Sequence, residues 1–142
     1  MAVKIDIVLL DSLTEQAKAS PRLRMNLDLR TSDADTSQRM LNAIEPGSVV
    51  PIHRHQKTSE TFVVLRGKVV EEFYDELERI CFATYEVSAG GPVCALNIPA
   101  GTWHNVINLG RNPLKVSVIY APPNHPRGTI HVTKADVKRE EC

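Results

Sequence analysis

His53 and His55 stand one residue apart in the stretch GSVVPIHRHQKTSETFVVLRG, and Glu60 follows them five positions later. Residues i and i+2 of a β-strand project to the same face, so a strand here points both imidazoles at one place. If the next strand pairs with it antiparallel, the carboxylate of Glu60 reaches the same place. Two histidines and one carboxylate on neighbouring strands form a recognised site for a divalent metal with open coordination positions.

His104 is a fourth candidate ligand, far along the chain in the stretch IPAGTWHNVIN. A turn at Pro99 and Gly101 leads into a strand that begins with Trp103 and His104. Distance in sequence does not prevent this histidine from joining the other three groups, because strands far apart in the chain can be neighbours in a closed barrel.

The elements that must position these side chains are short strands. The stretch RLRMNLDLR alternates strictly, with Leu23 and Leu27 on one face and polar side chains on the other. Further runs with strand character are separated by Pro, Gly, Asn or charged clusters. They cover residues 38–45, 49–55, 60–66, 68–74, 80–88, 94–98, 104–109 and 114–121. So many short strands with so little helix predict an all-β sandwich or barrel.

The N-terminal region contains the one helix that the sequence predicts. Ser12 and Glu15 have the spacing of a capping box, and Pro21 disfavours a continuing helix, so the helix is expected at residues 12–19. The preceding run VKIDIVLL reads as an apolar strand that pairs with a second chain, and we therefore expect a homodimer. We divide the single domain of residues 1–142 into an extension (1–21), a barrel (22–121) and a polar tail (122–142).

The composition of the chain bears on its binding partners and its location in the cell. Lysine plus arginine equals aspartate plus glutamate at 17 each, so the charge favours neither a nucleic acid nor a membrane as partner. The N-terminal apolar run is interrupted by Asp6 and is too short for a signal peptide or a membrane span. Three widely spaced cysteines form no disulfide framework or thiolate pair. We therefore expect reduced thiols in a cytoplasmic protein.

Two motifs resemble those of the cupin superfamily. The first combines two glycines with the His-x-His pair and a glutamate, and the second combines Pro-x-Gly with a histidine and an asparagine. The matching residues are Gly47, His53, His55, Glu60 and Gly67 for the first motif and Pro99, Gly101, His104 and Asn108 for the second. The resemblance implies a jelly-roll β-barrel that holds one manganese, iron, nickel, zinc or cobalt ion through His53, His55, Glu60 and His104.

A narrower resemblance covers most of the chain. The segments SPRLRMNLDLR, SQRMLNAIEPGSVVPIHRH, ETFVVLRG and IPAGTWHNV are similar to those of the WbuC family of cupins. That family is associated with O-antigen and surface-polysaccharide gene sets. The resemblance therefore implies a link to polysaccharide biosynthesis, with a small-molecule ligand that is anionic or related to sugars.

The remaining polar side chains have two possible readings each. Arg22, Arg24 and Asn26 lie either on a solvated strand face or at the barrel mouth, where guanidinium groups would bind an anion. Trp103 either packs in the core or stacks on a ligand. Glu71 and the acidic residues near it are expected in a solvated hairpin. The function stays open between a ligand-binding or sensor protein and a metal-dependent dioxygenase or isomerase, because the sequence offers no clear second acid near the metal.

Overall fold

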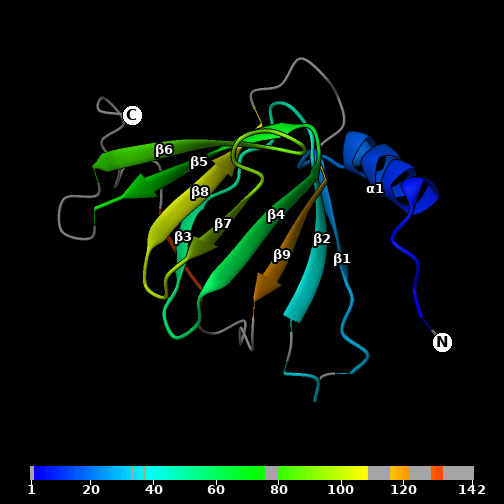
Figure 1. Ribbon diagram of the computed structural model, residues 1–142, viewed down its shortest axis with the longest axis horizontal. Helices are drawn as coiled ribbons and strands as arrows, with labels where there is room; N and C mark the ends of the chain where they lie inside the picture. Colours follow the sequence, from blue (N-terminus) through cyan, green and yellow to red (C-terminus); the bar gives the residue numbers. More distant parts are fainter. Residues whose placement is uncertain are drawn as a thin grey trace.

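The computed structural model describes residues 2–32, 34–36, 38–75, 80–108, 116–121 and 129–132. For Phe62 and for the last two of these stretches it describes the backbone alone. Within these residues one helix accompanies two five-stranded antiparallel sheets, which face each other (Figure 1). None of the described helices is both long and apolar enough to cross a membrane.

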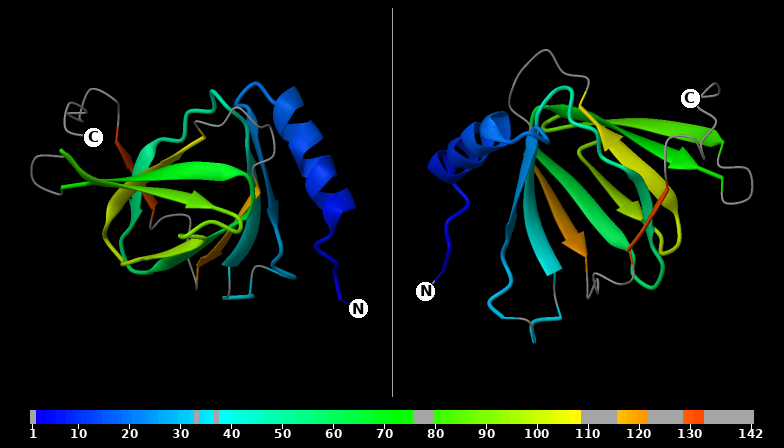
Figure 2. Two further views of the ribbon diagram at one scale, coloured as in Figure 1. Left: turned by 45° about the horizontal axis from the view of Figure 1, so that its top comes forward. Right: turned by 180° about the vertical axis from the view of Figure 1, so that it is seen from behind.

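The first sheet has the strand order β1-β2-β9-β4-β7, and the second has the order β10-β3-β8-β5-β6. Apart from β1–β2 and β5–β6, neighbouring strands in both sheets are non-consecutive in the chain. Two further views of the ribbon show the two sheets facing each other (Figure 2). The strands of the first sheet are β1 (Arg24–Asp28), β2 (Gln38–Ile44), β9 (Val116–Ala121), β4 (Glu60–Arg66) and β7 (Ala95–Ile98). Those of the second are β10 (Thr129–Val132), β3 (Ile52–His55), β8 (Trp103–Ile107), β5 (Lys68–Tyr74) and β6 (Cys81–Ser88).

The all-β fold with a short N-terminal helix is confirmed, and each expected strand is present with ends that shift by a few residues. The pairings recorded among the described residues form two sheets and do not close into one barrel. One strand was not expected, because β10 lies in the segment that the sequence analysis assigned to a polar tail.

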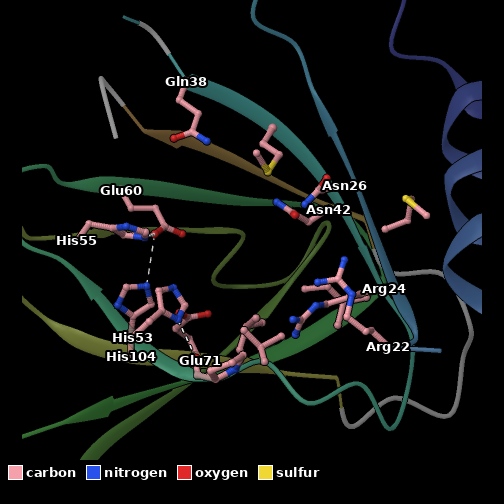
Figure 3. A pocket seen from close by; sticks show the side chains of 16 residues that line it. Arg22, Arg24, Asn26, Gln38, Asn42, His53, His55, Glu60, Glu71 and His104 are labelled. Atoms are coloured by element: carbon pink, nitrogen blue, oxygen red, sulfur yellow. Dashed lines mark hydrogen bonds and ion pairs between the residues drawn. The ribbon is translucent and has the colours of Figure 1, made fainter. Parts of the chain in front are cut away.

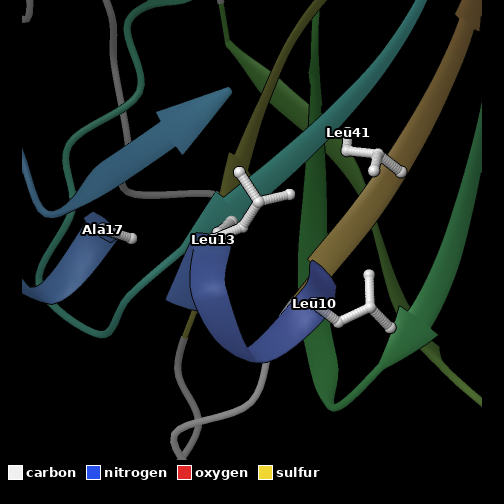
Figure 4. Close-up of a cluster of buried hydrophobic side chains, with 5 residues drawn as sticks. Leu10, Leu13, Ala17 and Leu41 are labelled. Atoms are coloured by element: carbon white, nitrogen blue, oxygen red, sulfur yellow. The ribbon is translucent and has the colours of Figure 1, made fainter. Parts of the chain in front are cut away.

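Helix α1 (Ile7–Ala19) covers the outer face of the first sheet, beside β1 and β2 (Figure 1). Its apolar side chains recur at helical spacing, so Leu10, Leu13 and Ala17 are all buried and pack with Leu41 of β2 (Figure 4). Burying a leucine side chain contributes roughly 1.5–3 kcal/mol. This cluster fixes the helix on the sheet.

The start of α1 differs from the prediction. The side chain of Asp6 accepts a hydrogen bond from the backbone N–H of Leu9 at 3.0 Å, so the helix begins at Ile7 rather than near Ser12. Asp6 interrupts the apolar run because it is the cap of this helix. The expected N-terminal strand is therefore wrong for residues 7–10, which are helical.

A second apolar cluster joins the two sheets. Ile44 and Val64 of the first sheet pack with Val69, Val87 and Val106 of the second, and all five are buried. Alternate residues of each strand point to the same face, so the side chains that follow these five along the strands also point between the sheets. The histidines lie farther along the same interior.

The expected solvated hairpin is wrong at its central residues. Glu71 is 1% exposed and Glu72 is 7% exposed, although both lie on β5, which the sequence placed at the surface. Glu72 accepts a hydrogen bond from the hydroxyl of Tyr74 at 3.0 Å. The expectation of reduced thiols is wrong at Cys81, which is buried and disulfide-bonded. Cys94 is free and exposed.

Candidate metal centre

Four side chains converge between the sheets. His53 and His55 lie on β3, His104 lies on β8, and Glu60 is the first residue of β4. One nitrogen or oxygen atom from each lies within 4.8 Å of the corresponding atoms of the other three. The three imidazoles therefore come from the second sheet, and the carboxylate comes from the first.

The route by which Glu60 reaches the histidines differs from the expected one. Strands β3 and β4 lie in different sheets and do not pair with each other. Instead, the short connection after His55 carries the chain from one sheet to the other, and Glu60 faces the histidines (Figure 3). His104 joins them because it is the backbone partner of His53.

Backbone carbonyl groups orient two of the histidines. Nδ1 of His53 lies 2.8 Å from the carbonyl oxygen of Pro51, and Nδ1 of His104 lies 2.8 Å from that of Thr102. A carbonyl oxygen only accepts, so each Nδ1 carries the proton and donates it. Nε2 is then the unprotonated nitrogen in both rings, with its lone pair available to a cation.

Glu60 holds its charge in this buried position. Its Oε2 lies 2.8 Å from Nε2 of His55 and 3.3 Å from Nε2 of His104. Burial raises the pKa of Glu60, but hydrogen bonds from the His104 and His55 imidazoles in their protonated form outweigh it and hold that pKa well below its usual range. Burial, together with the neighbouring His104, lowers the pKa of His53 to about 3. Near neutral pH the cluster therefore offers an ionised carboxylate and a neutral His53 imidazole.

The cluster leaves two buried atoms without hydrogen bonds. Neither Oε2 of Glu60 nor Nε2 of His104 makes a hydrogen bond of good geometry, although Oε2 lies close to the ring nitrogens of His55 and His104 and both side chains are buried. Two lone pairs that face each other repel, whereas a cation between them satisfies both. Imidazole nitrogens and a carboxylate oxygen are suitable ligands for divalent manganese, iron, cobalt, nickel and zinc. The residues present therefore fit one such ion.

A glycine turn ties β8 to the end of β3. The backbone N–H of Gly101 donates a hydrogen bond to the carbonyl oxygen of His55 at 2.8 Å. Gly101 has φ +81°, a conformation that glycine adopts without strain and other residues rarely adopt. This bond fixes the turn that precedes His104 beside His55, another of the four candidate ligands.

Asn108, the last residue of the second motif, has a structural role. Its side chain donates a hydrogen bond to the carbonyl oxygen of Ile44 at 2.6 Å.

A cavity of about 330 Å³ opens in front of the cluster. Arg22, Arg24 and Asn26 line it together with the four clustered residues, and Figure 3 shows the two arginines across the cavity from the histidines. Arg24 donates a hydrogen bond to the carbonyl oxygen of Val49 at 2.7 Å, which fixes its guanidinium group. Burial and the nearby Arg22 lower the pKa of Arg24, which remains cationic at neutral pH.

Trp103 does not line this cavity. It precedes His104 on β8, so its side chain projects to the opposite face, where it is buried with Ile52 and Tyr74. The guanidinium carbon of Arg54 lies 4.6 Å from the centre of the indole ring. The structure thus places Trp103 in a packing cluster on the far side of the sheet from the candidate ligands.

Glu71 lines the cavity and was missed by sequence reasoning. Its Oε2 is buried and has no hydrogen-bond partner. Burial, with Glu60 and Glu72 nearby, raises the pKa of Glu71 well above its usual value. The signal was present in the stretch KVVEEFY, because Val69 and Phe73 share a strand face with Glu71 and are both apolar.

Known proteins share both the sequence pattern and the fold. The family model described as a domain of unknown function (DUF6016) matches residues 5–84. The uncharacterized protein YrkC of Bacillus subtilis is 66% identical over 47 residues, which are 33% of this chain and 25% of YrkC. The match thus spans about a quarter of that curated relative.

Two solved structures are similar over most of this chain. BH2720 from Bacillus halodurans is 31% identical with a TM-score of 0.58, over 95% of this chain and 92% of BH2720. The capsular polysaccharide assembling protein CapF from Staphylococcus aureus is 26% identical with a TM-score of 0.64, over 80% of this chain but 32% of CapF. Both are cupin-like, and with the cluster of histidines and glutamate they suggest a metal-binding cupin.

Proposed function

This chain belongs to the DUF6016 family, and we propose that it binds one divalent transition metal through His53, His55, Glu60 and His104 and a small anionic molecule beside it. The observation that best supports metal binding is the fixed orientation of two of the candidate ligands. His53 and His104 each use Nδ1 to bond a backbone carbonyl, so Nε2 is presented to the interior. If these histidines served packing alone, the buried Nε2 of His104 would have no hydrogen-bond partner.

The charge of the cavity supports an anionic ligand. Neutral imidazoles, the Glu60 carboxylate and one divalent ion give a net charge of about +1, and the two guanidinium groups of Arg22 and Arg24 add about +2. An anion placed between the ion and Arg24 neutralises part of this charge at both ends. A planar guanidinium group also offers a carboxylate or a phosphate two parallel hydrogen bonds.

The likeness to CapF supports a ligand related to sugars. That protein is described as assembling capsular polysaccharide, and this chain corresponds to about a third of it. The resemblance to the WbuC family points to the same area of metabolism. We therefore propose a role in surface-polysaccharide metabolism, with nucleotide sugars and small carboxylic acids as the first ligands to test.

Glu71 favours an enzyme over a purely binding role. A second acid near the metal is the feature that separates the two, and Glu71 is such an acid in the wall of the same cavity. When bound, the metal would act as a Lewis acid that polarises an oxygen of the ligand. A metal-dependent isomerase needs a group that moves a proton close to that oxygen, and Glu71 lies in the cavity where such a ligand would bind.

Metal analysis tests this function directly. Protein purified without chelator or nickel resin should contain close to one divalent metal per chain. A thermal-shift screen of that protein with nucleotide sugars and small carboxylic acids should raise the melting temperature with anionic compounds. Protein that contains no metal and takes up none of the five candidate ions would contradict the proposal.

A further inference from the structure

Two buried polar atoms in the wall of the cavity lack hydrogen-bond partners, and they come from opposite sheets. Gln38 of β2 presents Oε1, and Glu71 of β5 presents Oε2. Figure 3 places these side chains at opposite edges of the cavity, with the histidines and the arginines along the other two sides. Buried polar atoms are paired in nearly all proteins, so two unpaired atoms facing one cavity point to partners that a ligand supplies.

The chemistry of these two groups specifies what that ligand carries. The amide oxygen of Gln38 accepts a hydrogen bond. The carboxyl group of Glu71 is buried, and its unpaired oxygen accepts a hydrogen bond or, when the group is protonated, donates one. A hydroxyl group both donates and accepts, and it is therefore the ligand group that satisfies either side chain.

The other side of the cavity supplies groups that would bind a second part of the ligand. Arg22 and Arg24 suit a carboxylate, and a volume of about 330 Å³ lies at the small end of ligand sites, where a monosaccharide fits. We propose that the cavity binds a hydroxylated carboxylate of the sugar-acid class, whose hydroxyl groups contact Gln38 and Glu71 and whose carboxylate contacts Arg24. This inference rests on the metal-dependent and anion-dependent binding function proposed above.

The ligand class is tested with three probes of similar size. Calorimetric titration of the manganese-loaded protein compares D-glucuronate with D-glucose, which lacks the carboxylate, and with hexanoate, which lacks the hydroxyl groups. Glucuronate should bind at least about tenfold more tightly than either, because each control leaves polar groups of the site unpaired. Affinity for glucuronate no greater than that for the two controls would overturn the ligand class.

The residues are tested with variants of different hydrogen-bonding ability. Glu71→Leu and Gln38→Leu should each weaken glucuronate binding about tenfold or more, with metal content unchanged. Glu71→Gln keeps a donor and an acceptor, so it should remain within about threefold of the wild type. The matched control is Glu72→Gln, which alters the neighbouring residue on the opposite face of β5 and should leave glucuronate affinity unchanged.

Three results would overturn the assignment of the two residues. Leucine variants that bind glucuronate as tightly as the wild type would show that the two atoms do not contact the ligand. Loss of metal from Glu71→Gln would make Glu71 a metal ligand instead. If Glu71→Leu fails to fold, the Gln38→Leu variant decides the question. Glucuronate binding by that variant as tight as that of the wild type would contradict the proposed contacts of both residues. Wild-type protein that holds no metal contradicts the proposed function, whereas wild-type protein that holds metal but ignores glucuronate contradicts the sugar-acid inference alone.

Discussion

His53 and His104 are backbone partners across β3 and β8, and their ring centroids lie 4.4 Å apart. The pairing of the two strands therefore sets the separation of these two candidate ligands, and the side chains need little freedom of their own. A carbonyl oxygen then fixes each ring, at Pro51 and at Thr102. Such prior ordering lowers the entropic cost of binding an ion, because few rotamers are lost when it arrives.

Replacing His53 and His55 together by alanine should abolish stoichiometric metal and leave the protein folded. Both histidines line the cavity, and neither belongs to the apolar clusters that stabilise the sheets. Metal content is measured by mass spectrometry, and folding by circular dichroism. Lys57→Ala, an exposed change close to the pair, serves as the control and should keep its metal. A double variant with one metal per chain would rule out these ligands.

Metal-free protein should lose stability as the pH falls from about 6.5 toward about 3. The pKa of His53 is about 3 in the folded state against 6.5 ordinarily, so the unfolded chain takes up that proton first. A single group of this kind changes the free energy of unfolding by up to about 1.4 kcal/mol per pH unit. Glu60 acts in the same direction, because its pKa is lowered and its stabilisation is lost in acid.

Urea unfolding of chelator-treated protein at several pH values measures this slope. The variant with His53 replaced by alanine should show a shallower loss of stability between pH 6.5 and pH 4. An identical slope in the variant and the wild type would remove His53 as the cause.

Glu71 should have the opposite pH dependence. Its raised pKa means that the folded state holds the proton more tightly than the unfolded chain does, so stability is lost as the pH rises above about 4.5. Glu71→Gln removes this titration and should raise the melting temperature of the metal-free protein by several degrees at pH 8, and by less at pH 5. Differential scanning calorimetry at the two pH values measures the difference. Equal shifts at both would argue against a buried neutral acid.

Arg24→Ala should weaken the binding of an anionic ligand by about 1.5–3 kcal/mol, or roughly ten- to a hundredfold, without changing metal content. Its guanidinium group lines the cavity and is fixed by the Val49 carbonyl. The control is Arg30→Ala, since Arg30 pairs with Asp28 outside the cavity and such surface pairs contribute little. Calorimetric titration with the best compound of the ligand screen compares the two variants. Unchanged affinity for Arg24→Ala would place the anion elsewhere.

The expected homodimer remains a prediction, and the structure refines where to test it. Ile7 and Val8 are 66% and 72% exposed at the start of α1, so apolar side chains are available to a second chain. Ile7→Glu combined with Val8→Glu should halve the mass measured by light scattering at micromolar concentration. Gln16→Glu on the same helix is the control and should leave the mass unchanged. A wild-type monomer under these conditions would contradict the prediction.

Local patterns were enough to predict the strands and the four clustered side chains. The alternation of His53 and His55 along one strand requires only the geometry of that strand. The partners of each strand depend on contacts between distant segments. The sequence could therefore offer the pairing of β3 with β4 only as a possibility, and the two strands lie in different sheets. The burial of Glu71 was missed for a related reason, since a pair of adjacent glutamates suggests solvent unless the opposing sheet is known.

The two faces of strand β1 have different neighbours, and this limits how its length can change. Leu27 packs toward α1, while Arg24 and Asn26 line the cavity on the other side. Inserting or deleting one residue within β1 would exchange the faces beyond that point, so polar side chains would meet the helix and leucines would meet the ligand. A change of two residues would restore the alternation. We therefore expect length differences among DUF6016 proteins to avoid β1 or to occur there in even numbers.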